Sequence, residues 1–294
     1  MSRSAYLTVN LEDILKDVDM DAVSRAIEET PGFDALGVED QDECRELVWL
    51  AAESWLARDL QEFESVEFEI PLAGGRSRLD MVAVMRGSMA PFDKYAGSKI
   101  IVDWKTTALA VDTDSWKQKC EDSWQWKIYG SLLPEAKLFN YRGLSRERGV
   151  WRGRSDDATP ARRVRDVLLE LNPQLAAEVA LQKQGIIGAY NLWIEMGLPV
   201  WPRNTGSCWA FNQRCPYKTE CDTNTMPIGI EGLDKRDDLS YSRMNVIMLC
   251  PERARRNALY EVQDITEKDS DATVLGQSFH RGVEELWRQA FKCR

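Results

Sequence analysis

The chain has 294 residues, with 48 acidic against 38 basic side chains, a formal net charge of −10 and 44% hydrophobic residues. This composition is typical of a globular protein with a sizeable core, and it excludes both a disordered chain and a protein that coats nucleic acid by bulk charge. The single histidine, His280, excludes zinc sites that need two or more histidines, and a Ser-His-Asp triad would have to include it. An enzyme with a local basic groove around an acidic, metal-binding centre stays compatible with the negative charge.

Helices are expected first, over residues 10–60, where apolar residues recur at three-to-four spacing. The next segment alternates apolar with acidic residues, the Gly74-Gly75 pair turns the chain, and a later segment begins as an apolar run. These patterns predict three strands, at residues 65–72, 76–85 and 98–107.

Helical segments are expected to dominate the remainder. A helix around residues 122–133 ends before Pro134, residues 162–197 are expected to be largely helical, and a last helical segment runs from about residue 240 to the end. Between the first two of these, residues 142–165 hold eight arginines against three acidic side chains. The order of strands and helices predicts a mixed α/β fold.

The N-terminal segment lacks the apolar stretch of a secretory signal, and the sequence has no run of about eighteen apolar residues. We therefore expect no membrane segment and a cytoplasmic, reducing environment. In such an environment the seven cysteines are expected to be metal ligands or buried thiols. Three of them, Cys208, Cys215 and Cys221, fall within fourteen residues.

Charged side chains interrupt two of the predicted strands. Asp103 and Lys105 are two residues apart, so they point to the same face of the third strand, and Asp80 lies in the preceding strand. A surface ion pair would explain Asp103 and Lys105 alone, but a second aspartate on the adjacent strand favours an oxygen-rich site for Mg²⁺ or Mn²⁺. A lysine beside such an ion can orient a water molecule and stabilise developing negative charge.

This pattern resembles the PD-(D/E)XK nuclease superfamily. Asp80 matches its first carboxylate strand, and Asp103 with Lys105 matches its D/E-x-K tripeptide. Gln125 and Tyr129, about one helical turn apart, match the Q-x-x-x-Y helix of the RecB-like branch, although core packing would also explain Tyr129. The resemblance implies a restriction-endonuclease-like core, a central mixed sheet flanked by helices, with an added helical region.

The cysteine cluster is similar to that of the RecB-like, AddB-like iron–sulfur exonucleases of phage and CRISPR-associated type. In those proteins three C-terminal cysteines and one distant cysteine hold a [4Fe–4S] cluster. Zinc is the alternative metal, because three cysteines with a fourth ligand also suit zinc, and unliganded buried thiols are the remaining alternative.

The first motif of this family usually precedes all the others, but here matching residues stand near the C-terminus. Cys250 is followed by proline, and His280 and Glu284 lie at i and i+4 on one predicted helix. This order predicts a circular permutation, in which Glu284 and His280 join the metal site and Cys250 becomes the fourth cluster ligand. In the competing interpretation, residues 240–294 begin a second nuclease copy or form an unrelated tail, and Glu53 and Cys44 complete the two sites.

The resemblance implies a Mg²⁺- or Mn²⁺-dependent DNA exonuclease of phage or prokaryotic recombination, repair or CRISPR-type processing, acting in the host cytoplasm if it is phage-encoded. It implies DNA as substrate and either self-association or a helicase or recombinase partner. A catalytically inactive cluster-containing DNA-binding subunit and a zinc-stabilised interaction protein are the alternatives.

We expect a single domain over residues 1–294, with these parts in order: a helical region (1–62), the core strands and motif helix (63–132), a basic and helical region (133–200), the cysteine cluster (201–225), a linker (226–239) and the first-motif segment (240–294).

The arginine-rich segment is the expected DNA-binding track, because the guanidinium group recognises phosphate with two parallel hydrogen bonds. A charged surface in contact with solvent alone would have the same sequence pattern. The expected DNA-binding arginines are Arg146, Arg148, Arg152 and Arg154. Tryptophans that could stack on unpaired bases are Trp124, Trp126, Trp151 and Trp209.

Overall fold

The computed structural model describes residues 10–71, 78–87, 93–146, 160–198, 200–206, 208, 215–223, 233–236, 241–262 and 271–292. These residues form two compact units. Unit 1 holds the described residues up to 172 together with the C-terminal helix α13 (Asp271–Lys292). Unit 2 holds the described residues from 173 to 262.

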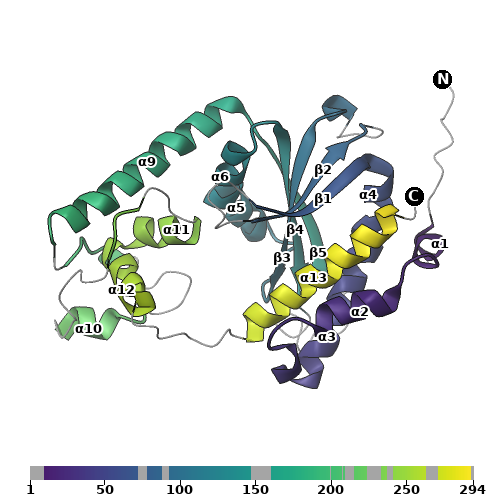
Figure 1. The fold of residues 1–294 in the computed structure, drawn as a ribbon, viewed down its shortest axis with the longest axis horizontal. Coiled ribbons are helices and arrows are strands. Elements are labelled where there is room, and N and C mark those ends of the chain that lie inside the picture. The colour runs from purple at the N-terminus through teal and green to yellow at the C-terminus, as the bar shows by residue number, and fades with distance from the viewer. Residues whose placement is uncertain are drawn as a thin grey trace. The chain divides into compact units, whose positions relative to one another are not determined.

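Unit 1 is built on a five-stranded sheet with the order β1-β2-β3-β4-β5 (Figure 1). Only β3 and β4 are parallel, and the other neighbouring pairs are antiparallel. The predicted α/β fold, a mixed sheet flanked by helices, is therefore confirmed. The strands are β1 (Phe63–Pro71), β2 (Arg78–Met85), β3 (Lys99–Thr107), β4 (Ala136–Ser145) and β5 (Val164–Glu170).

The first three strands agree with the sequence-based expectation, but β4 was not predicted and residues 164–170 were wrongly expected to be helical. Val164, Val167, Leu168 and Leu171 have the i, i+3, i+4, i+7 spacing of a helix face. Pairing with β4 overrides this local pattern, because Leu144 aligns with Val164 and the ladder continues to the end of the strand.

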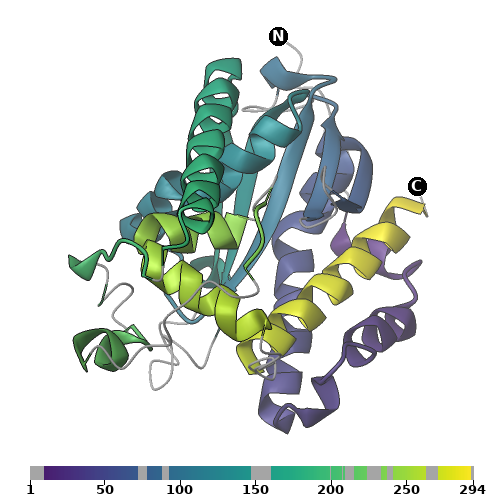
Figure 2. The ribbon, with the colours of Figure 1, turned by 60° about the vertical axis from the view of Figure 1, so that its left-hand side comes forward.

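Helices from both ends of the chain cover one face of the sheet. The helical segments on this face are α2 (Met20–Glu28), α3 (Val38–Ala51), a π-helical turn (Ala52–Leu56), α4 (Ala57–Glu62) and α13. Both views show α13 beside α2 and α3 (Figures 1 and 2). Gly282 allows this approach, because a Cβ at this position would lie 2.7 Å from Ile27 Cγ1 and 2.8 Å from Val48 Cγ2.

Two consecutive helices cover the other face, α5 (Asp114–Asp122) and α6 (Trp124–Leu132). The Thr113 and Ser123 hydroxyl groups accept the backbone N–H groups of Trp116 and Gln125, and thereby cap the N-termini of the two helices. Helix α6 ends shortly before Pro134, as predicted. The shorter elements of unit 1 are α1 (Leu11–Leu15), α8 (Pro160–Arg163) and the 3₁₀ turns Phe33–Ala35 and Asp93–Tyr95.

Unit 2 is helical in its described part. Its helices are α9 (Pro173–Glu195), α10 (Lys218–Thr223), α11 (Tyr241–Leu249) and α12 (Pro251–Val262). The Trp201 ring lies 1% exposed against the rings of Tyr190 and Trp193, with centroid distances of 5.2 and 5.1 Å. Within the described residues of both units, none of the helices has the length and apolar content needed to cross a membrane.

Candidate functional site

The two predicted metal-binding aspartates lie on neighbouring strands of unit 1. Because Met81 of β2 aligns with Val102 of the antiparallel β3, Asp80 and Asp103 come next to each other at one end of the hairpin. The backbone N–H of Trp104 donates to Asp80 Oδ2 at 2.9 Å. The hairpin register therefore brings two carboxyl groups from residues far apart in the sequence to one place.

Asp103 is the most enclosed member of this group, with 2% of its side chain exposed. Its Oδ2 atom lies 2.7 Å from Lys105 Nζ, and its Oδ1 atom accepts a 3.0 Å hydrogen bond from Gln125 Nε2. Gln125 belongs to the first turn of α6, and Tyr129, one turn later, packs on the Phe139 ring at 6.2 Å between centroids. Helix α6 therefore holds the Asp103 carboxylate from one face of the sheet.

Helix α13 reaches the same group from the other face. His280 Nδ1 lies 3.4 Å from Asp80 Oδ2. The site thus combines side chains from β2, β3, α6 and α13, and the only histidine in the chain is one of them.

The charged side chains of this group shift one another's pKa values. Burial, together with the neighbouring Asp80 charge, raises the pKa of Asp103 to about 6 although Lys105 opposes the change. The pKa of Asp80 is lowered: burial acts against this, but His280 and Lys105 outweigh it. Burial alone would lower the pKa values of Lys105 and His280. The charges of Asp80 and Asp103 outweigh this effect, so both pKa values are raised. The two carboxyl groups, of which Asp103 is buried, are accordingly balanced by nearby positive charge.

The two candidate glutamates occupy different surroundings. Glu284 lies one turn after His280 on α13 and forms an ion pair with Arg288. Glu53 lies in the π-helical turn with its side chain exposed. The structure brings His280 to Asp80, and the described partner of Glu284 is Arg288.

The described arginines of the segment 142–165 are engaged inside unit 1. Arg146 pairs with Asp40 at 2.8 Å and with Glu43 at 2.9 Å, and fully buried Arg142 pairs with another acidic side chain, Asp59, at 2.6 Å. These ion pairs hold the sheet to its helices, and the Arg146 side chain remains 20% exposed. Arg148, Arg152 and Arg154 lie outside the described residues.

Two of the tryptophans proposed for stacking are on α6. Lys127 Nζ lies 5.2 Å from the Trp124 ring centroid and 5.6 Å from that of Trp126, and both indoles are partly buried. Trp151 and Trp209 lie outside the described residues.

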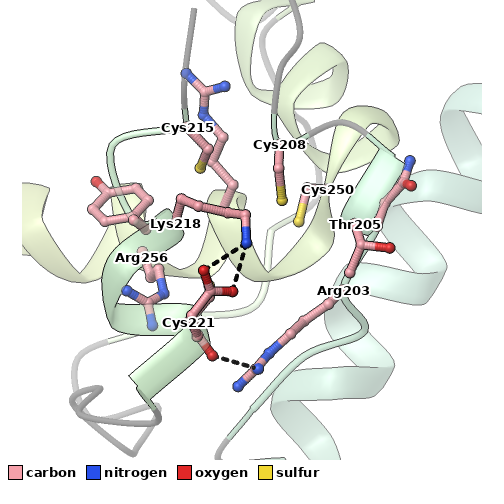
Figure 3. A pocket seen from close by; sticks show the side chains of 12 residues that line it. Arg203, Thr205, Cys208, Cys215, Lys218, Cys221, Cys250 and Arg256 are labelled. Atoms are coloured by element: carbon pink, nitrogen blue, oxygen red, sulfur yellow. Dashed lines mark hydrogen bonds and ion pairs between the residues drawn. The ribbon is translucent and has the colours of Figure 1, made fainter.

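The cysteines predicted to hold a cluster line one pocket in unit 2 (Figure 3). They come from three segments: the loop after Trp201, the segment that enters α10, and the start of α12. The four are Cys208, Cys215, Cys221 and Cys250. Cationic residues also line the pocket, namely Arg203, Lys218, Arg253 and Arg256.

Cys44, the alternative fourth ligand, has a different environment. It is fully buried in the apolar core of unit 1, and its thiol donates to the Leu275 carbonyl oxygen at 3.9 Å. Burial raises the pKa of the Cys44 thiol to about 12, which disfavours the thiolate that metal binding requires. The structure therefore groups Cys250, rather than Cys44, with the clustered cysteines.

The donor chemistry suits metals at both places: carboxylates and an imidazole in unit 1, and four thiols with cationic neighbours in unit 2. In the part of the chain that the structure describes, no three His, Cys, Asp or Glu side chains converge in the arrangement of ligands around one metal ion. In the structure the Asp103 carboxylate is paired with an ammonium group, because Lys105 Nζ lies 2.7 Å from Asp103 Oδ2.

Sequence reasoning missed the buried acidic residue Glu252 and its arginine partners, although the run Pro-Glu-Arg-Ala-Arg-Arg directly after Cys250 was a visible signal. Charged residues at i, i+3 and i+4 share a helix face, so this run predicts an ion-pair group beside the cysteine. No family model, curated protein sequence or solved structure matches this chain.

Proposed function

We propose that this chain is a metal-dependent deoxyribonuclease of the PD-(D/E)XK type, acting as an exonuclease on DNA in phage or prokaryotic recombination, repair or CRISPR-type processing. The observation that carries the proposal is the group of Asp80, Asp103 and Lys105 on adjacent strands, in which Asp103 is buried, Gln125 binds Asp103 and His280 lies beside Asp80. A surface ion pair would need neither the burial nor the second aspartate.

In the proposed reaction Asp80, Asp103 and Glu284, with His280 assisting, would hold one or two Mg²⁺ or Mn²⁺ ions. A divalent ion bound there would acidify a water ligand and neutralise charge on the scissile phosphate. Lys105, whose pKa is raised by the two carboxylates against the effect of burial, stays protonated and orients the attacking water as a cation. Gln125 fixes the rotamer of Asp103 through its 3.0 Å hydrogen bond.

The topology of unit 1 supports the same proposal. An antiparallel hairpin, β1–β2, continues antiparallel into β3, and after α5 and α6 the chain returns as β4, parallel to β3. This is the arrangement implied by a restriction-endonuclease-like core. Helix α13 carries His280 to within 3.4 Å of Asp80 Oδ2, which supports the proposed circular permutation.

For unit 2 we propose a [4Fe–4S] cluster held by the four pocket cysteines, with zinc as the alternative metal. Hydrolysis needs no electron transfer, so the proposed role of the cluster is structural. A homo-oligomer or a complex with a helicase or recombinase is the proposed assembly.

The test is degradation of end-labelled linear DNA by the purified chain with Mg²⁺ or Mn²⁺. We expect Asp103→Asn and Lys105→Ala each to slow degradation by about 100- to 1,000-fold, the usual loss when a charge-stabilising group is removed. Asp112→Asn, which breaks a 2.8 Å ion pair with Arg162 in the same unit, is the matched control and should keep full activity. Full activity in both site variants refutes the nuclease proposal. A wild-type chain that binds DNA without degrading it supports the inactive-subunit alternative instead.

A further inference from the structure

The cysteine pocket of unit 2 is assembled from three chain segments that need a common support. Cys208 follows the loop that starts at Trp201, Cys215 and Cys221 flank the turn into α10, and Cys250 directly precedes α12. Because a metal site needs its ligands at fixed positions, the contacts that join these segments can determine the geometry of the pocket.

A single buried carboxylate lies where these segments meet. Glu252, in the first turn of α12, is 1% exposed. Its Oε2 atom accepts the backbone N–H of Trp201 at 2.8 Å, and its own backbone N–H donates to the Pro202 carbonyl oxygen at 3.1 Å. Glu252 therefore joins the loop that leads to Cys208 to the helix that begins directly after Cys250.

The same carboxylate also holds two fully buried arginines. Glu252 Oε1 accepts from Arg255 Nη2 at 2.7 Å and from Arg256 Nε at 3.0 Å. Arg256 continues to Glu220 on α10, the residue before Cys221. Through Arg256, the carboxylate thus reaches the third cysteine-bearing segment.

Further contacts cross between the segments at their edges. Arg256 lies over the Tyr217 ring, 5.1 Å from its centroid, and Arg203 Nη1 donates to the Cys221 carbonyl oxygen at 3.1 Å. Asn204 Nδ2 donates to the Leu249 carbonyl oxygen at 2.9 Å. Each of these contacts joins two of the three segments, and Arg203 and Arg256 also line the pocket.

We propose that Glu252 is the positioning residue of the cysteine pocket: through Trp201, Arg255 and Arg256 it joins the three segments that carry the four cysteines, and thereby supports the binding of one metal group by their thiols. This inference rests on the proposed function for its metal. A buried ion-pair group adds little net stability compared with apolar packing, so its advantage here is the fixed geometry of the segments that it joins. Removing a residue that contacts and orients metal ligands, without binding the metal itself, typically lowers metal affinity by about 10- to 100-fold.

The experiment uses the full-length chain, reconstituted without oxygen using Fe²⁺ and sulfide, and separately loaded with Zn²⁺. Iron, sulfide and zinc per chain are measured, followed by the rate of metal release to a chelator. We expect Glu252→Gln to release metal about 10- to 100-fold faster than the wild type. Far-UV circular dichroism and the melting temperature of the metal-free chain report any merely structural loss.

The matched control is Asn191→Ala, which removes two 2.8 Å hydrogen bonds between α9 and Arg236 in the same unit, away from the pocket. Equal release from Glu252→Gln and the wild type, or equally fast release from the control, overturns the inference. If Glu252→Gln does not fold, the rate of metal release is measured for Glu220→Gln instead. The Glu220 side chain is 37% exposed, and this change removes its ion pair with Arg256. Release from Glu220→Gln as slow as from the wild type then overturns the inference.

A wild-type chain that takes up neither iron nor zinc refutes the proposed cofactor, and with it the inference. Metal retained equally by the wild type and the Glu252 variant refutes the positioning role alone. Cys221→Ala marks the loss expected when a ligand itself is removed.

Discussion

Removing the charge of Asp59 should destabilise unit 1 far more than removing a similar charge at its surface. Asp59 is fully buried, and its two oxygens accept from Arg142 Nη1 and Nη2 at 2.6 Å each, so the guanidinium is bound by two parallel hydrogen bonds. Its Oδ2 atom also accepts the indole N–H of Trp287 at 2.8 Å. One carboxylate therefore joins α4, β4 and α13.

The expected magnitude follows from burial. Asp59→Asn removes the carboxylate that lies 2.6 Å from Arg142 and leaves this buried guanidinium with the more distant Asp166, at 3.7 Å; breaking a buried ion pair typically costs about 3–5 kcal/mol in the free energy of unfolding. The matched control is Asp13→Asn, because Asp13 also lies 2.6 Å from its partner, Lys16, but the two side chains are 65% and 72% exposed. For such a surface pair we expect a loss of about 0.5 kcal/mol or less.

The assay is urea unfolding at constant pH and salt, combined with hydrogen exchange of the peptide 271–292. Because Trp287 lies on α13, Asp59→Asn should also speed exchange in that helix, whereas Asp13→Asn should not. A loss below about 1 kcal/mol for Asp59→Asn, or equal losses for the two variants, would contradict the argument that burial makes this pair strong.

Three further outcomes are expected. Glu284→Ala should abolish metal-dependent DNA degradation while Glu53→Ala is tolerated, and the reverse result in the same assay would refute the circular permutation. Cys250→Ala should lose the reconstituted iron while Cys44→Ala keeps it, as measured by iron per chain; equal retention would remove Cys250 from the ligand set. Because burial raises the pKa of Asp103 to about 6, its ionisation costs stability as the pH rises through that value, and a bound Mn²⁺ relieves this cost. Mn²⁺ should therefore raise the melting temperature more at about pH 8 than at about pH 5, and a shift independent of pH would argue against Asp103 as a ligand.

Local sequence patterns were sufficient for the elements next to Asp80 and Asp103. The alternation that ends at Ile70 and the apolar run before Asp103 predicted β1 and β3, and Pro134 predicted the end of α6. These signals depend on side-chain periodicity and on backbone restrictions, which act between near neighbours in the chain.

The strands at the far edge of the sheet could not be recognised in this way. In β5 the helix-like spacing of apolar residues competes with pairing to β4, and only the long-range ladder decides between them. The arginine-rich segment illustrates the same limit. Nothing local reveals that Arg142 and Arg146 have acidic partners on α3 and α4, because those partners are about 80 to 110 residues away in the sequence.

The sequence by itself determined the chemistry that is available: two aspartates and a lysine at strand ends, one histidine, a group of cysteines and a net negative charge. Only the tertiary structure decided which of these residues meet. It placed His280 beside Asp80, grouped Cys250 with the clustered cysteines and left Cys44 in the core. The physical reason is that spacing along a strand or helix governs only neighbouring side chains, whereas burial and long-range pairing select partners from the whole chain.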